Sequence, residues 1–189
     1  MKAYVISLPD RSDRFEKTYP LLTDRGFEAR RYVAHRLFPG WMGCTASHLG
    51  ALASIGAAPF AIFEDDIEFI GEMDTVQAAM HQVDFDMLFL GCDPQEKMTR
   101  ASENALRVGR LHQTHAIIYG SDRVVDFILS KRNEIRKIDI FLSEEVIPKF
   151  NCYATYPMIC KQTDGYSDIT RREVDFKYVT EAFNSMIEP

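Results

Sequence analysis

The sequence predicts an α/β protein with a mostly parallel central sheet and helices on both of its faces. Short apolar segments alternate along the chain with amphipathic segments, which is typical of strands that alternate with helices. The first three segments form a strand–helix–strand unit, whose right-handed crossover produces parallel strands. The apolar segment 59–63 shows no polar alternation, as expected of a central strand that is covered on both faces.

Length and composition indicate a single domain that spans residues 1–189. The chain is 46% hydrophobic and 12% aromatic, which is enough for one packed core. Acidic residues outnumber basic residues by 28 to 22, for a formal net charge of −6. This balance argues against general affinity for nucleic acid or for anionic lipid.

Targeting signals are missing from the sequence, and we expect a cytoplasmic protein. No apolar stretch approaches the ~20 residues of a membrane span, so no integral membrane segment is expected. The apolar part of the first ten residues is too short for a signal peptide. The four cysteines form no CxxC pair, which indicates neither a zinc ribbon nor a disulfide framework.

The N-terminal segments 2–8, 12–25 and 27–34 are predicted to be a strand, a helix and a second strand. Gly26 follows the helix, where a glycine is a good C-cap residue. Arg11 and Arg14 lie at the strand-to-helix turn, close to a helix N-terminus that favours anions. They are either contacts for a nucleotide phosphate or charges on a solvated first turn.

The segment 43–69 contains the features on which the functional interpretation depends. Residues 43–55 are predicted to form a helix that carries His48, and the strand 59–63 leads directly into Glu64, Asp65 and Asp66. Strand alternation predicts Glu64 and Asp66 on one side and Asp65 on the other. At the carboxyl end of a strand, such oxygens suit Mg²⁺ or Mn²⁺ and could hold nucleotide phosphates. Acids in a turn or a helix cap are the alternative.

The remaining segments continue the α/β pattern. We expect a polar loop over 97–104, and either a packing helix or an ordered tail in the last twenty residues. Asp139 lies at a helix start, where capping alone could explain it. The other predicted helices are 71–83, 121–132 and 140–150, and the other predicted strands are 85–91, 106–111, 114–120 and one within 152–160.

Several blocks, taken in order, resemble glycosyltransferase family 25, the lipopolysaccharide and collagen galactosyltransferase-type proteins. Gly43-Cys44-Thr45-Ala46-Ser47-His48 is similar to that family's GCxxSH motif, and Phe63-Glu64-Asp65-Asp66 resembles its EDD motif. The remaining similar blocks are Ile6-Ser7-Leu8 with Arg11 and Arg14, 85–91, Thr114-His115-Ala116, Ile138-Asp139, and Gln162 with Ser167-Asp168-Ile169.

This resemblance implies a GT-A type fold and metal-assisted, inverting transfer of a hexose (galactose or glucose) from a UDP-sugar. The acceptor would be a hydroxyl group of a saccharide or of another molecule, which is hexosyltransferase chemistry. Mn²⁺ or Mg²⁺ would neutralise the departing diphosphate. Asp139 is the first choice for the base that takes the acceptor's proton, and His115 and Asp168 are its competitors. The implied donor contacts are Leu8, Arg11, Arg14, His48, Glu64 and Asp65, and the implied metal ligands are Asp66 and Asp168.

Two other functions fit the same residues. The family places a Glu shortly before its GC pair, whereas this chain has Trp41, and the segment before Gly43 is short. Both differences favour a silent domain that binds a nucleotide or sugar without reaction. Another metal-dependent transfer, such as nucleotidyl transfer, would use the same acids but would leave residues 43–48 unexplained.

Overall fold

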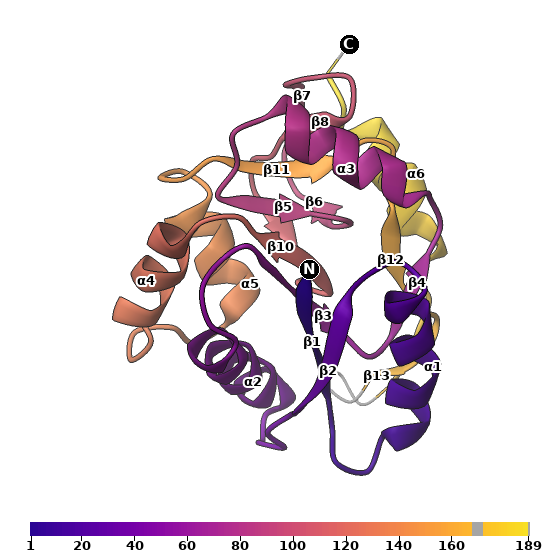
Figure 1. Cartoon of the computed structure of the whole chain (residues 1–189), viewed down its shortest axis with the longest axis vertical. Coiled ribbons are helices and arrows are strands. Elements are labelled where there is room, and N and C mark those ends of the chain that lie inside the picture. Colours follow the sequence, from indigo (N-terminus) through magenta and orange to yellow (C-terminus); the bar gives the residue numbers. More distant parts are fainter. Residues whose placement is uncertain (168–171, 189) are drawn as a thin grey trace.

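The computed structural model describes residues 1–167 and 172–188, which form a mixed α/β structure around an eight-stranded sheet (Figure 1). The strand order is β2-β1-β3-β10-β5-β11-β8-β7. The pairings place β10 and β8 antiparallel to their neighbours and the other six strands in one direction. The predicted fold class, a mostly parallel sheet between helices, is therefore confirmed.

The N-terminal half of the chain matches the expected elements within a few residues and adds one short strand, β4, that was not predicted. In order they are β1 (Lys2–Ser7), α1 (Ser12–Thr23), β2 (Glu28–Val33), α2 (Gly40–Ser54), β3 (Phe60–Glu64), β4 (Ile67–Phe69) and α3 (Met73–Gln82). After α1, Gly26 has a φ of +81°, a left-handed conformation that glycine adopts without a side-chain clash. The parallel pairing of β1 with both β2 and β3 follows from the βαβ unit.

The second half contains shorter elements than the sequence predicts. The strands are β5 (Met87–Phe89), β6 (Asp93–Pro94), β7 (Thr99–Arg100), β8 (Ala105–Arg107), β9 (Leu111–His112), β10 (Ala116–Tyr119), β11 (Cys152–Thr155), β12 (Cys160–Gln162), β13 (Gly165–Ser167) and β14 (Arg172–Val174). The helices are α4 (Asp122–Ser130), α5 (Ile138–Phe141), the π-helical turn η1 (Leu142–Val146) and α6 (Lys177–Ser185).

Three predictions in this half differ from the structure. The strand expected over 106–111 is divided between β8 and β9, which belong to different sheets. The segment 97–104, expected as a loop beside the site, contains β7 at the sheet edge opposite β2 and lines none of the cavities described below. The expected helix 140–150 is instead split between α5 and η1. Local polarity predicted a loop at 97–104, but pairing with β8 determines its conformation.

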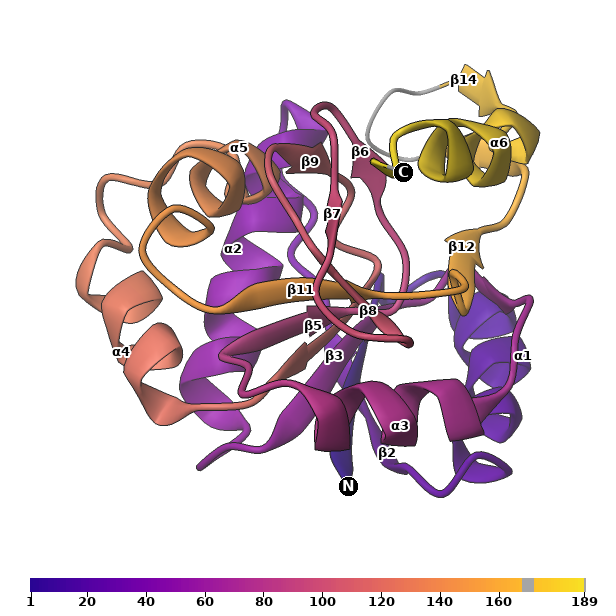
Figure 2. The same ribbon diagram turned by 90° about the horizontal axis from the view of Figure 1, so that it is seen from above.

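Helices cover both faces of the sheet (Figure 2). One core cluster packs α2, α4 and α5 on one face, through residues such as Leu52, Ile62 and Ile128. The other cluster packs α1 and α3 on the opposite face, through Leu22, Phe63 and Val76. Alternate residues of β3 enter opposite clusters, which explains why this strand is apolar throughout.

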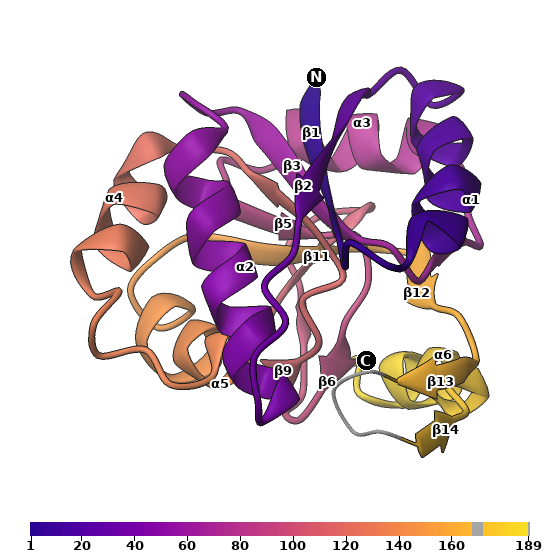
Figure 3. The same ribbon diagram turned by 90° about the horizontal axis from the view of Figure 1, so that it is seen from below.

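The C-terminal elements lie beside the edge of the sheet at which β1 and β3 end (Figure 3). Strand β12 pairs with β4, and this register sets Gln162 opposite Ile67, directly after the acid residues. Strands β13 and β14 form an antiparallel pair next to α6. In the described part of the chain, no helix has the length and apolar character needed to cross a membrane.

Candidate functional site

A cavity of about 490 Å³ opens at the carboxyl ends of β1 and β3. Glu64, Asp65 and Asp66 line it together with Arg14 from the first turns of α1. Its other walls come from Leu8, from the segment 34–38, and from the C-terminal residues 162–167, 174 and 176. The acid residues therefore face a cleft at the sheet edge where ligands of α/β proteins bind.

A second cavity, of about 710 Å³, adjoins the first. Asp139, Thr114 and Trp41 line the second cavity and not the first, whereas Cys44 and Glu64 line both. The Glu64 side chain thus lies in the wall between two compartments. Such an arrangement provides room for two ligands whose reacting groups meet near Glu64.

The three acids do not alternate as predicted. Strand β3 ends at Glu64, and Asp65 and Asp66 form the turn before β4. The carboxylates of Asp65 and Asp66 therefore both lie 3.7 Å from Nη1 of Arg14. The expected separation of Asp65 from Asp66 is wrong, because the alternation of a strand ends where the strand ends.

Glu64 is instead held by residues of α2 and of the segment before β10. Its Oε1 atom accepts a hydrogen bond of 2.8 Å from the Thr114 hydroxyl and lies 3.2 Å from Nε2 of His48. Burial opposes ionisation of Glu64, but the hydrogen bond from His48, the charge of His48 and the Thr114 hydroxyl outweigh it and lower the pKa. Glu64 is a fixed carboxylate at the boundary of the two cavities.

Asp66 has much weaker support. Its carboxylate accepts only long contacts, 3.4 and 3.5 Å, from Nε2 of Gln162, besides the ion pair with Arg14. Burial and then the negative charges of Glu64 and Asp65 raise the pKa of Asp66 to about 7. Burial also raises the pKa of Asp65, and this effect exceeds the opposing effects of Ser7 and Arg14. The turn therefore holds more negative charge than its protein partners neutralise.

Gly43 and Ser47, from the block 43–48, hold α2 against the segment 34–38. A Cβ atom on Gly43 would lie 2.3 Å from the His35 carbonyl oxygen, so only glycine lets α2 approach the segment 34–38 this closely. The Ser47 hydroxyl donates to the Gly43 carbonyl at 2.6 Å and accepts from the His35 backbone N–H at 2.8 Å. These contacts fix one wall of the first cavity.

Thr45 fixes one wall of the second cavity. Its hydroxyl donates to the Arg136 carbonyl and accepts from the Ile138 backbone N–H, both at 3.1 Å. The start of α5, and with it Asp139, is thereby attached to α2. Asp139 Oδ1 also accepts a bond of 2.9 Å from the Ile140 N–H, as expected of a residue near a helix start.

The structure brings together most, but not all, of the residues that the sequence singled out. Leu8, Arg14 and the three acids line the first cavity, and Asp139 lines the second. His48 is fully buried behind Glu64. Two further predicted residues line neither cavity. The Arg11 side chain lies 3.5 Å from Asp13, and His115 is fully buried with Nε2 3.2 Å from the Cys160 carbonyl. The predicted ligand Asp168 falls outside the described residues.

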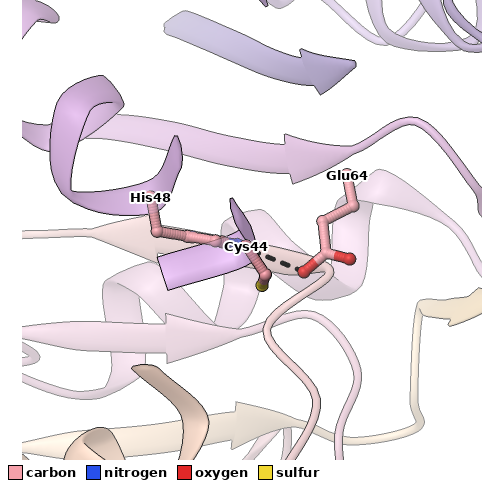
Figure 4. A group of neighbouring side chains, drawn as sticks. All are labelled: Cys44, His48 and Glu64. Atoms are coloured by element: carbon pink, nitrogen blue, oxygen red, sulfur yellow. Dashed lines mark hydrogen bonds and ion pairs between the residues drawn. The ribbon is translucent and has the colours of Figure 1, made fainter. Parts of the chain in front are cut away.

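Sequence reasoning missed two residues that surround Glu64, namely Thr114 and Cys44. Cys44 lies one helical turn before His48, and the i, i+4 spacing placed both side chains on one face of α2. Figure 4 shows the side chains of His48 and Glu64 meeting beside Cys44. Thr114 stands in the block Thr114-His115-Ala116 that the sequence singled out, but the role was expected of His115. The antiparallel pairing of β10 with β3 brings Thr114 to Glu64 instead.

Comparisons with known proteins show the fold. No family model matches the chain, and no curated protein matches it. The chain is similar in structure to A197 from STIV, with a TM-score of 0.52 and 11% identity over 92% of each chain. The inositol-1-phosphate CTP transferase from T. maritima gives a TM-score of 0.48 at 12% identity, over 98% of this chain and 95% of that one. UDP-glucose pyrophosphorylase complexed with UDP-glucose gives 0.46 at 15% identity, over 97% and 80%. At 11% identity, the likeness to A197 indicates a shared α/β fold and says nothing about function, which must be argued from the residues of the site.

Proposed function

We propose that this chain is a glycosyltransferase that moves a hexose from a UDP-sugar to a hydroxyl group of a saccharide or another acceptor, with inversion. The observation that carries the proposal is the position of Glu64 in the wall between two adjoining cavities. One cavity has acids and an arginine suited to a diphosphate and its cation. The other offers a carboxylate suited to an acceptor hydroxyl.

The first cavity is the proposed donor site. Arg14 would contact the diphosphate, and Leu8 would border the nucleotide. Asp65 and Asp66 fit a hard divalent cation such as Mn²⁺ or Mg²⁺, because their carboxylates share one arginine and retain excess negative charge. Such a cation would neutralise the charge that develops on the leaving diphosphate.

The second cavity is the proposed acceptor site. Trp41 provides an aromatic surface of the kind on which sugar rings pack, and Asp139 provides a base. The acceptor oxygen forms a bond to the anomeric carbon while the bond from that carbon to the diphosphate breaks. The proton of the acceptor hydroxyl passes to Asp139, and the electron pair of the broken bond leaves with the diphosphate. A base on the side opposite to the leaving group gives inversion.

The similarity of the blocks 43–48 and 63–66 to glycosyltransferase family 25 supports the same assignment. In this chain those blocks build the two cavities: Gly43 and Ser47 fix a wall of the first, Thr45 attaches the start of α5, and His48 holds Glu64. A nucleotidyltransferase would use the same acids and also needs room for two substrates, so the similarity of the block 43–48, and not the number of cavities, favours glycosyl transfer.

A donor screen tests this function. UDP-hexoses are incubated with Mn²⁺ and simple saccharide acceptors, and released UDP and pyrophosphate are measured separately. We expect UDP release, and a fall of about 10²- to 10⁴-fold in kcat for Asp139→Asn with unchanged UDP affinity. Asparagine keeps the Oδ1 acceptor for the Ile140 N–H, so the helix start is retained.

Asp126→Asn, an exposed acid on α4, is the matched control and should leave kcat unchanged. Release of pyrophosphate in place of UDP would replace the proposal with nucleotidyl transfer. Tight UDP binding without release from any donor would indicate a silent binding domain.

A further inference from the structure

We propose that Cys44, His48 and Glu64 form a binding site for a borderline-soft divalent cation of the zinc class. One donor atom from each of the three side chains lies within 4.8 Å of the other two. Cys44 and His48 come from consecutive turns of α2, and Glu64 comes from the end of β3 (Figure 4). The ligand set of this site differs from that of Asp65 and Asp66, which offer only carboxylate oxygens, and it does not depend on the proposed transferase activity.

The spacing of these atoms suits tetrahedral coordination. Protein ligands lie about 2.0–2.3 Å from zinc, which places neighbouring ligand atoms roughly 3.4–3.6 Å apart. Nε2 of His48 and Oε1 of Glu64 are already 3.2 Å apart. His48 is fully buried and fixed in place, whereas Cys44 is only half-buried at the cavity wall. The donor atom of Cys44 lies within 4.8 Å of the other two, so a small shift of the side chains would bring all three to coordinating distance.

The chemistry of the three groups selects the kind of cation. A thiolate and an imidazole favour Zn²⁺ or Co²⁺ over Mg²⁺, Mn²⁺ or Ca²⁺, which prefer oxygen ligands. Three protein ligands also leave a fourth coordination position open, as in zinc sites that accept water or a substrate. Cys44 and Glu64 line both cavities, so this open position faces the space between them.

The local charge also favours a cation. Asp65 and Asp66 follow Glu64 directly, and Asp139 lines the second cavity together with Cys44 and Glu64. Arg14 contacts Asp65 and Asp66, at 3.7 Å. The described hydrogen bonds to the Glu64 carboxylate come from His48 and Thr114, of which Thr114 carries no charge.

A simpler arrangement would be a hydrogen-bonded triad in which His48 and Thr114 only position Glu64. That arrangement needs no thiol, so Cys44 distinguishes the two. Its replacement by serine removes a strong zinc ligand with little change in volume and leaves the contacts of His48 and Thr114 with Glu64 intact.

Cobalt titration of the full chain tests the site without nucleotide. The reduced, chelator-treated protein is titrated with Co²⁺, and bound Zn²⁺ is then counted by displacement of Co²⁺. We expect one equivalent of Co²⁺ with a thiolate-to-cobalt charge-transfer band and the visible bands of tetrahedral cobalt. Zn²⁺ should abolish both signals. Cys44→Ser should lose the charge-transfer band and more than about tenfold in Zn²⁺ affinity.

Cys92→Ser is the matched control, because Cys92 is a buried thiol outside the cluster. It should retain the charge-transfer band. The site is refuted if the folded wild-type protein binds no stoichiometric Co²⁺, or if the charge-transfer band persists in Cys44→Ser. Failure of the donor screen alone leaves these signals unchanged, so the two proposals fail independently.

Discussion

Two aspartates, one before β5 and one after β3, have very different surroundings in this fold, and β10 separates their two strands in the sheet. Asp86, just before β5, accepts hydrogen bonds from Ser121, from Nε and Nη2 of Arg123, and from the Asn151 backbone N–H, at 2.5–2.9 Å. Asp66, just after β3, has only contacts of 3.4–3.7 Å with Gln162 and Arg14.

The pKa values of the two side chains diverge accordingly. Burial would raise the pKa of Asp86, but Arg123, Ser121 and the Asn151 N–H outweigh it and lower the pKa to about 2. Burial and the neighbouring carboxylates raise the pKa of Asp66 to about 7. A carboxylate with several short hydrogen bonds is part of the structure, whereas one left under-neutralised in a cavity is ready for a ligand.

The largest expected effect on stability is at Asp86. Asp86→Ala leaves the Asn151 N–H, the Ser121 hydroxyl and the Arg123 guanidinium without their common acceptor. We expect a loss of about 2–4 kcal/mol in the free energy of unfolding, measured by denaturant titration. A loss below about 0.5 kcal/mol would show that this network contributes no more than an exposed ion pair.

Asp66 should behave in the opposite way. Asp66→Asn removes a buried negative charge that lies beside Glu64 and Asp65, so the metal-free protein should gain about 1–2 kcal/mol of stability at pH 8. Thermal and denaturant unfolding in the presence of a chelator measures this gain. A loss of stability comparable to that of Asp86→Ala would contradict the view that the acid turn is under-neutralised.

The pH dependence of these two variants sharpens the contrast. The pKa of Asp86 is lowered in the folded state, so its stabilisation is present above pH ~4 and is lost as the pH falls towards 2. The pKa of Asp66 is raised, so its destabilisation grows as the pH rises from ~4 through 7 and is then constant. The free-energy difference between wild type and Asp66→Asn should therefore be small at pH 4 and largest above pH 7. A difference independent of pH would contradict this assignment.

Two matched hydroxyl groups extend the comparison, and the one beside Glu64 has the smallest expected effect. Ser121→Ala removes a hydrogen bond to Asp86, and Thr114→Val removes one to Glu64. Hydrogen bonds to charged groups contribute about 1.5–3 kcal/mol, so Ser121→Ala should cost roughly that amount. Thr114→Val should cost less, about 1 kcal/mol, because Glu64 faces a cavity where water can replace the hydroxyl. Equal losses in urea titrations would show that both carboxylates are equally enclosed.

The sequence predicted much of the fold because its signals are local. The apolar strand 60–64, the βαβ unit and the turn at Gly26 depend on neighbouring residues, and each was found. Because β3 ends at Glu64, Asp65 and Asp66 both contact Arg14 instead of pointing to opposite sides. Alternation indicates orientation only while the strand continues.

The remaining features of the site depend on long-range pairing, which one sequence does not reveal. Thr114 reaches Glu64 because β10 pairs antiparallel with β3, and Gln162 reaches Asp66 because β12 pairs with β4. His115 lies next to Thr114 in the chain, yet its side chain is buried against the Cys160 carbonyl and lines neither cavity. Only the tertiary structure shows that Thr114 contacts Glu64 and that His115 does not line the site.

The central claim is that the acid turn takes up a hard cation that links the protein to a nucleotide diphosphate. Calorimetric titration of the wild-type protein and Asp66→Asn with UDP, with and without Mn²⁺, tests this most directly. We predict that UDP binds the wild-type protein at least tenfold more tightly with Mn²⁺, and that Asp66→Asn loses this enhancement while Asp84→Asn, at an exposed position, retains it. UDP affinity that is the same with and without Mn²⁺, or an enhancement that survives in Asp66→Asn, would contradict the claim.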